Sequence, residues 1–142
     1  MKGTYVLLIR LERDRKIRIG SLGLRGFKGG YYAYVGSGMS SLEKRIERHL
    51  KSEKKKFWHI DYLLGKAKVI KVIYFESERK ECELAEKLAG EFDGVSKFGC
   101  SDCRCKSHLF YSESSLEKEV LEITRSLRGS RSPLRILKSG AS

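Results

Sequence analysis

A phenol, a guanidinium and an imidazole lie within one short stretch of this sequence. Tyr34 lies in an aromatic segment, residues 31–35, and a Gly-Ser-Gly turn separates this segment from Arg45 and His49. A phenol or an imidazole can move a proton or position a water molecule, and a guanidinium can bind a phosphate group through two hydrogen bonds. Together these three groups suit the hydrolysis of a phosphodiester bond.

The elements around these residues predict a strand, a turn and a helix. Residues 31–35 favour a strand, and Ser40 with Glu43 matches the capping box that begins a helix. One face of this helix is apolar: Leu42, Ile46 and Leu50. Arg45 and His49 project onto the edge of that face, one turn apart. That position suits an active-site pair, and equally a pair that only covers the boundary of the core.

A carboxylate on a later helix is a candidate metal ligand. Residues 78–92 predict a helix with Leu84, Ala85, Leu88 and Phe92 on its apolar face. Glu81 projects onto the middle of that face, where a carboxylate is costly unless it is paired or binds a cation. Mg²⁺ needs few protein carboxylates, so Glu81 alone would suffice. The alternative is that Glu81 only interacts favourably with the dipole of its helix.

The remaining patterns predict one α/β (α+β) domain over residues 1–128. Its expected elements are strands at 4–11 and 15–22 that form a hairpin, a glycine-rich link at 23–30, a short helix at 57–64 with core aromatics, a strand at 68–76 covered on both faces, and a helix at 115–127. These elements predict a small mixed or antiparallel central sheet flanked by helices. Residues 129–142 are predicted to form a basic, flexible tail.

The net charge points to nucleic acid as the partner. The 142 residues carry 30 Lys and Arg against 18 Asp and Glu, a formal net charge of +12, which attracts polyanions. Candidate phosphate contacts are Lys54, Lys55, Lys56, Arg104 and Lys106. The alternative is that these cations contact only water.

Composition and hydropathy also indicate the environment and the cellular compartment of the protein. The chain has no Asn and no Gln but many Lys and Glu, which is typical of proteins from hot environments. No apolar run approaches the roughly 20 residues of a membrane-spanning helix. Residues 4–11 read as a strand and not as a signal peptide. We therefore expect a cytoplasmic protein that does not associate with membranes.

The cysteines form a second group with possible chemistry. Four potential ligands lie in one short segment, Cys100, Cys103, Cys105 and His108, and Cys82 lies on the preceding helix. Three thiolates and an imidazole can hold tetrahedral zinc, although this spacing is tighter than that of standard zinc fingers. The alternatives are a disulfide between Cys82 and one of the later cysteines, or reduced buried thiols.

Several of these residues resemble the motifs of the GIY-YIG nuclease domain. Gly3-Thr4-Tyr5 is similar to its first motif and Tyr34-Val35-Gly36 to its second. Arg45 and His49 match its helix arginine and the histidine that follows in many members, and Arg79-Lys80-Glu81 resembles its metal-binding segment. The whole chain looks closest to an uncharacterised archaeal GIY-YIG-like family, which is sometimes fused to endonuclease III-type repair enzymes.

The resemblance implies hydrolysis of DNA with one metal ion, in the context of DNA repair. Tyr5 or Tyr34 would activate or position the nucleophile, Arg45 would neutralise developing charge, His49 would shuttle a proton, and Glu81 would hold Mg²⁺ or Mn²⁺. The resemblance also implies possible association with a DNA-repair glycosylase. The chain lacks the asparagine that the family carries late in the domain. Two alternatives therefore stay open: a non-catalytic nucleic-acid-binding module on this scaffold, and an interaction domain stabilised by a metal or a disulfide at the cysteines.

Overall fold

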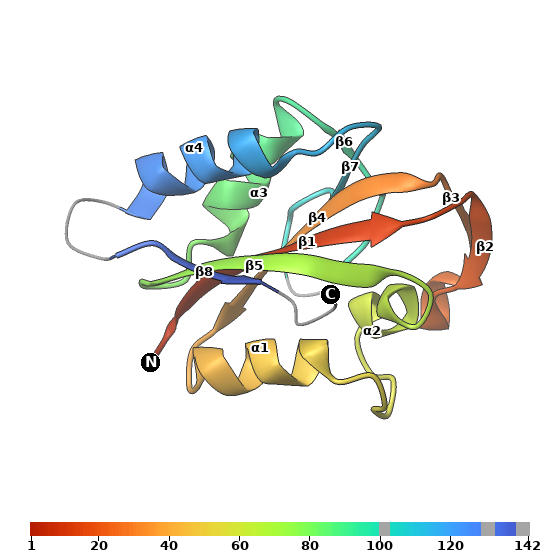
Figure 1. Ribbon diagram of the computed structural model, residues 1–142, viewed down its shortest axis with the longest axis horizontal. Coiled ribbons are helices and arrows are strands. Elements are labelled where there is room, and N and C mark those ends of the chain that lie inside the picture. Colours follow the sequence, from red (N-terminus) through yellow and green to blue (C-terminus); the bar gives the residue numbers. More distant parts are fainter. Residues whose placement is uncertain (100–102, 129–132, 139–142) are drawn as a thin grey trace.

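A computed structural model describes residues 1–99, 103–128 and 133–138 (Figure 1). Within these residues, a six-stranded sheet has the order β6-β7-β4-β1-β5-β8, and every pairing in it is antiparallel. Its strands are β1 (Gly3–Leu11), β4 (Gly30–Gly38), β5 (Lys68–Glu76), β6 (Asp93–Gly94), β7 (Leu109–Ser112) and β8 (Arg135–Lys138). The prediction of an α+β fold with a small central sheet flanked by helices is confirmed.

Helices cover both faces of the sheet (Figure 1). One core contains Tyr5, Leu7, Ile9 and Leu11 of β1, and it packs against α1 (Leu42–Leu50) and α2 (His59–Leu64). The other contains Val6 and Leu8, and it packs against α3 (Glu81–Ala89) and α4 (Glu117–Arg128). Because successive residues of a strand point to opposite faces, the apolar sequence of β1 serves both cores.

The predicted hairpin between residues 4–11 and 15–22 is wrong. β1 pairs with β4 and β5. The second segment forms β2 (Arg15–Arg18) and a short 3₁₀ helix, η1 (Gly20–Leu22), and β2 pairs with β3 (Leu24–Phe27) from the expected glycine-rich link. The physical reason is burial: β1 is apolar on both faces and takes the interior of the large sheet, whereas β2 has only Ile17 buried and suits a small outer sheet.

Several element ends differ from the sequence prediction. β4 runs on through Gly36-Ser37-Gly38, where a turn was expected, because these residues pair with the start of β1. The residue that caps α1 is Ser41 and not Ser40, since the Ser41 hydroxyl accepts a hydrogen bond from the Lys44 amide at 3.3 Å. α2 ends at Gly65 as predicted, but Phe57 before it is 77% exposed and lies outside the core.

Part of the predicted tail belongs to the sheet. Residues 135–138 form β8, which pairs with β5 as an edge strand, whereas the rest of the expected tail from 129 to 132 and from 139 to 142 lies outside the described residues. Among the residues that the structure describes, no helix has the length and apolar character needed to cross a membrane.

Candidate active site and metal cluster

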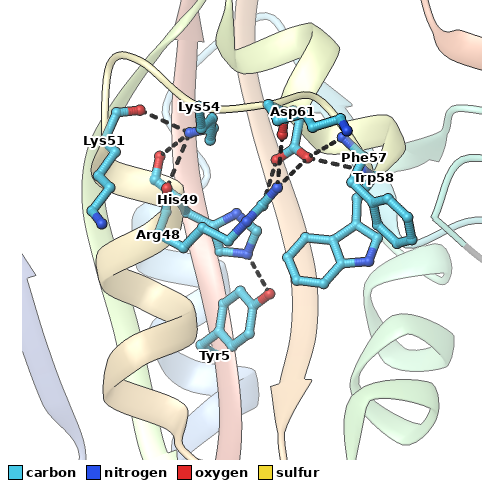
Figure 2. Close-up of polar contacts among 9 residues, drawn as sticks. Tyr5, Arg48, His49, Lys51, Lys54, Phe57, Trp58 and Asp61 are labelled. Carbon is cyan, nitrogen blue, oxygen red and sulfur yellow. Dashed lines mark hydrogen bonds and ion pairs between the residues drawn. The ribbon is translucent and has the colours of Figure 1, made fainter.

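The phenol of Tyr5 and the imidazole of His49 meet at the centre of the candidate active site. Tyr5 points from β1 toward α1, and its Oη lies 2.6 Å from Nε2 of His49 in the last turn of that helix (Figure 2). Both side chains are only 2% exposed. The helical spacing that put His49 at the edge of the apolar face therefore brings it against the first predicted tyrosine.

Gly36 makes room for this contact. It lies directly opposite Tyr5 in the β1–β4 pair, and a Cβ atom at this position would be 2.3 Å from the Tyr5 Oη and 2.4 Å from Cζ. Any other residue would thus displace the phenol. In the sequence, Gly36 is recognisable only as part of the second motif. The pattern that indicates its role is a glycine inside a strand, which often marks the close approach of another group.

Tyr34 lies beside the same imidazole. Its ring is edge-on to His49 with 6.1 Å between centroids, and the side chain is 8% exposed. On its other side lies Gly99, whose φ of +71° favours glycine and where a Cβ would come within 3.0 Å of the Tyr34 ring. Tyr34 therefore packs between His49 and the segment that leads to the cysteines.

Arg45 and Glu81 influence the pKa of the same phenol in opposite directions. Arg45 donates a hydrogen bond to the Ser37 carbonyl at 2.9 Å, and its guanidinium lies 4.6 Å from the centre of the Trp58 ring. Glu81 is the first residue of α3 and accepts a hydrogen bond from Arg79 at 3.1 Å. Arg45 lowers the pKa of Tyr5 and Glu81 raises it, so both charges lie near enough to influence the phenol.

Burial keeps the central pair uncharged. Desolvation, followed by the neighbouring Tyr34, raises the pKa of Tyr5 well above its usual value, and the opposing effect of Arg45 is too small to reverse this. Desolvation also lowers the pKa of His49 to about 3. In this state the pair can relay a proton, but Tyr5 is not an ionised base.

A supporting network, which was not predicted from the sequence, joins α1 to α2. Arg48 donates two hydrogen bonds to Asp61, each 2.9 Å long, and Asp61 also accepts from the amides of Phe57 and Trp58 at 2.8 Å (Figure 2). Burial alone would raise the pKa of Asp61, but these hydrogen bonds outweigh it and the pKa is lowered. The sequence signal was an acid within the otherwise apolar and aromatic segment 57–64.

Trp58 connects this network to the candidate active site. The guanidinium of Arg48 lies 4.3 Å from the Trp58 ring centre, and the ring of His49 lies 5.8 Å away. Arg45 also packs on this indole. Because cations and aromatic faces attract, Asp61 and Arg48 hold Trp58, and Trp58 in turn helps to fix Arg45 and His49.

Lys54 has a structural contact that the sequence analysis did not foresee. Its ammonium donates to the carbonyls of Arg48, His49 and Lys51, at 3.2, 2.9 and 2.9 Å (Figure 2). Burial lowers its pKa. Lys54 therefore caps the end of α1, and its charge is directed into the protein instead of toward a phosphate. Four of the predicted phosphate contacts do have exposed side chains: Lys55, Lys56, Arg104 and Lys106.

Four of the five expected metal ligands come together in what we call the thiol cluster. It consists of Cys82 on α3 and Cys103, Cys105 and His108 on the loop before β7, and their ligand atoms all lie within 4.8 Å of one another. The fifth residue, Cys100, lies outside the described residues. The three described cysteines carry free thiols. The thiol cluster is thus a Cys₃His group that could hold a metal ion.

Burial favours the uncharged forms of Cys82, Cys105 and His108 in the thiol cluster. Desolvation raises the pKa of Cys82 and of Cys105, and the neighbouring thiols raise that of Cys105 further. Desolvation lowers the pKa of His108, whose Nε2 lies 3.4 Å from Cys103 Sγ. Since a metal binds thiolates and neutral imidazole, His108 is ready to bind, whereas the thiols must release protons first.

The residues of the candidate active site and those of the thiol cluster lie within the range that one protein-family model matches. No curated protein and no solved structure matches the chain. The model of a family described as "Domain of unknown function DUF123" matches residues 4–129, and this range contains Tyr5, Tyr34, His49 and the thiol cluster. Because the match covers most of the 142 residues, the chain belongs to the DUF123 family.

Proposed function

We propose that this protein is a metal-dependent endonuclease that hydrolyses phosphodiester bonds in DNA, with a site of the GIY-YIG type. The observation that carries the proposal is the 2.6 Å hydrogen bond between Tyr5 and His49, with Tyr34 beside the imidazole and Arg45 near the phenol. These residues come from three separate segments of the chain. Their convergence provides a proton relay and a cation in one place.

The proposed roles follow from exposure and protonation. Tyr34, the more exposed of the two tyrosines, positions the attacking water. Tyr5 takes a proton from that water while its own proton moves to Nε2 of His49, so the phenol stays neutral. Before this step His49 is neutral because burial lowers its pKa to about 3. Among the described residues the Arg45 guanidinium makes one hydrogen bond, to the Ser37 carbonyl, so its other N–H groups can bind a phosphate oxygen.

Glu81 would hold the Mg²⁺ or Mn²⁺ ion of this site. Its carboxylate offers the hard oxygen that these ions prefer, and water and phosphate oxygens can complete the coordination. Its side chain is 17% exposed and paired with Arg79, so the oxygen is accessible but must exchange one partner. The metal would supply positive charge that stabilises the transition state.

We propose zinc for the thiol cluster. A tetrahedral site with zinc–sulfur distances of about 2.3 Å places its sulfur atoms roughly 3.8 Å apart, and the ligand atoms here span at most 4.8 Å, so a small closure suffices. Zinc would tie the loop before β7 to the start of α3, beside Glu81. Free thiols also fit the reducing cytoplasm, where we place the protein.

A second candidate function is a nucleic-acid-binding module without catalysis. The specific observation in its favour is that Tyr5 and His49 are each 2% exposed and that the pKa of Tyr5 is raised instead of lowered. In this case the same scaffold would bind the polyanion through its basic surface. The two functions differ in whether a cut product forms.

The test is cleavage of labelled duplex, branched and abasic DNA at elevated temperature with Mg²⁺ or Mn²⁺. Glu81→Gln should lower the rate by about 10² to 10³. Glu83→Gln is the matched control, because Glu83 lies in the same first turn but is exposed. Equal rates for the two variants would contradict the role of Glu81. Salt-sensitive DNA binding without cleavage would support the binding module instead.

A further inference from the structure

A hollow of about 540 Å³ lies at the end of β1 and the start of β5, and its lining is strongly basic. Seven of its lining residues are basic: Arg10, Arg13, Arg15, Lys66, Lys68, Lys71 and Lys138. The acid in this lining is Glu12. We call this surface the basic groove. Such a concentration of one charge raises the local concentration of anions.

The strand pairing places like charges directly opposite each other in the basic groove. Arg10 of β1 lies opposite Lys68 of β5, and Lys71 lies opposite Lys138 of β8. Like charges at opposite positions destabilise a sheet. Glu117 neutralises Lys71 through a 2.6 Å ion pair, whereas the ion pairs among the described residues include none with Arg10, Lys68 or Lys138. An anionic ligand would remove this repulsion.

The basic groove is separate from the candidate active site. Arg10 follows Val6 and Leu8 on the face of β1 that packs against α3 and α4, whereas Tyr5 points to the opposite face, toward α1. The two residues are also about 17 Å apart along the strand, at about 3.4 Å per residue. Substitutions in the basic groove therefore leave the Tyr5–His49 pair intact.

We propose that the basic groove binds the sugar-phosphate backbone of nucleic acid, as a contact surface additional to the candidate active site. The choice of nucleic acid rests on the proposed function. The charges lie at the end of β1 and in the turn after it, at the start of β5 and on the edge strand β8. This group of cations complements the successive phosphates of a nucleic-acid backbone. Because the surface is hollow and basic, it suits a protruding backbone better than a flat lipid headgroup layer.

The test measures DNA affinity against salt concentration, using fluorescence anisotropy of a labelled duplex without Mg²⁺ or Mn²⁺. The groove variant is Arg13→Gln with Lys68→Gln. The control variant is Arg125→Gln with Lys87→Gln, which removes the same two charge types from exposed positions on α4 and α3. Each lost phosphate contact should reduce the slope of log affinity against log salt by about 0.9, so the groove variant should lose about 1.8 and the control variant should keep the wild-type slope.

The proposal is overturned if the groove and control variants have the same slope, or if wild-type protein does not bind the duplex. It is also overturned if the groove substitutions weaken binding to phosphatidylserine-containing vesicles but not to DNA. Thermal unfolding controls for folding: the groove variant should melt at or above the wild-type temperature, because a like-charge contact is removed. Cleavage assays separate this proposal from the nuclease. If the protein cleaves DNA but the groove variant keeps the wild-type salt slope, only the proposal for the basic groove is rejected. If the groove variant has a reduced salt slope but the wild-type protein does not cleave DNA, only the proposed nuclease activity is rejected.

Discussion

The side chains of the candidate active site and those of the thiol cluster are held in place by different means. Tyr5 and Tyr34 lie on adjacent strands, and His49 lies on a helix packed against them, so sheet register and core packing set their distances. The thiol cluster joins the start of α3 to the loop before β7. In the first group the fold supplies the order, whereas in the second a bound metal would supply much of it.

The two groups also differ in protonation. Burial keeps Tyr5 and His49 neutral over a wide pH range, because the pKa of one is raised and that of the other is lowered. Burial also favours the neutral thiols of Cys82 and Cys105, but these must ionise to thiolates before they can bind a metal. A preassembled site therefore depends on packing and hydrogen bonds, whereas a metal cluster depends on the metal ion that it binds.

Removing the Tyr5 hydroxyl should have the largest effect. Tyr5→Phe keeps the ring but breaks the proton relay to His49, so the DNA cleavage rate should fall by about 10² to 10⁴. Tyr32→Phe is the matched control: Tyr32 is also buried and also loses a 2.6 Å hydrogen bond, here to the Lys28 carbonyl. Equal losses of cleavage in both variants would show that the effect comes from stability and not from the relay.

Metal removal should destabilise the thiol cluster. If zinc is present at about a thousand times its Kd, its loss lowers the free energy of unfolding by about 4 kcal/mol. Thermal unfolding with and without a chelator, together with metal analysis, measures this. Cys103→Ser should bind less metal and respond less to the chelator. If the purified protein contains no metal and its melting temperature changes with neither zinc nor chelator, the thiol cluster is held in place by the fold, as the candidate active site is.

Breaking the Asp61–Arg48 pair should weaken the support of the candidate active site. Asp61 is buried, and Asp61→Asn removes the charge that Arg48 and two amides bind, so unfolding should become easier by about 3 kcal/mol. Trp58 is the only tryptophan in the sequence, and its fluorescence should change as Arg48 leaves the ring. Asp93→Asn, at an exposed position, should change neither. An unaltered Trp58 signal in Asp61→Asn would argue against the network.

Acid should destabilise the folded protein through His49, and the loss of stability per pH unit should be smaller than the losses described above. The pKa of His49 falls from 6.5 in the unfolded chain to about 3 in the folded protein, so below pH 6.5 the unfolded state binds the proton first. Stability should therefore drop as the pH falls from about 6.5 to about 3, by at most about 1.4 kcal/mol per pH unit.

Denaturant unfolding of wild-type protein and His49→Gln between pH 6.5 and 4.5 measures this contribution. The variant has no imidazole at position 49, so its stability should depend less on pH in this window. Asp61 adds a loss only at lower pH, because its folded pKa lies below the ordinary value of 3.8. Parallel pH profiles for the two proteins would show that His49 is already solvated or charged in the native state.

Local patterns in the sequence were sufficient for much of the fold. The apolar runs at 4–11 and 68–76 predicted β1 and β5, and the amphipathic periodicity at 42–50 predicted α1, because side-chain direction repeats within one strand or helix. The same periodicity placed His49 against the core. The residue types also identified the thiol cluster, since thiols and imidazole are metal ligands wherever they meet.

Only the tertiary structure decided which segments meet. Pairing of β1 with β4 puts Gly36 under the Tyr5 phenol, and packing of α2 against α1 gives Arg48 its partner Asp61. The basic groove likewise arises from the register of three strands. These contacts join residues far apart in the chain. The sequence therefore determined the chemical groups and their local direction, whereas the fold decided their distances, their burial and hence their pKa values, because desolvation depends on every neighbour that packs around a group.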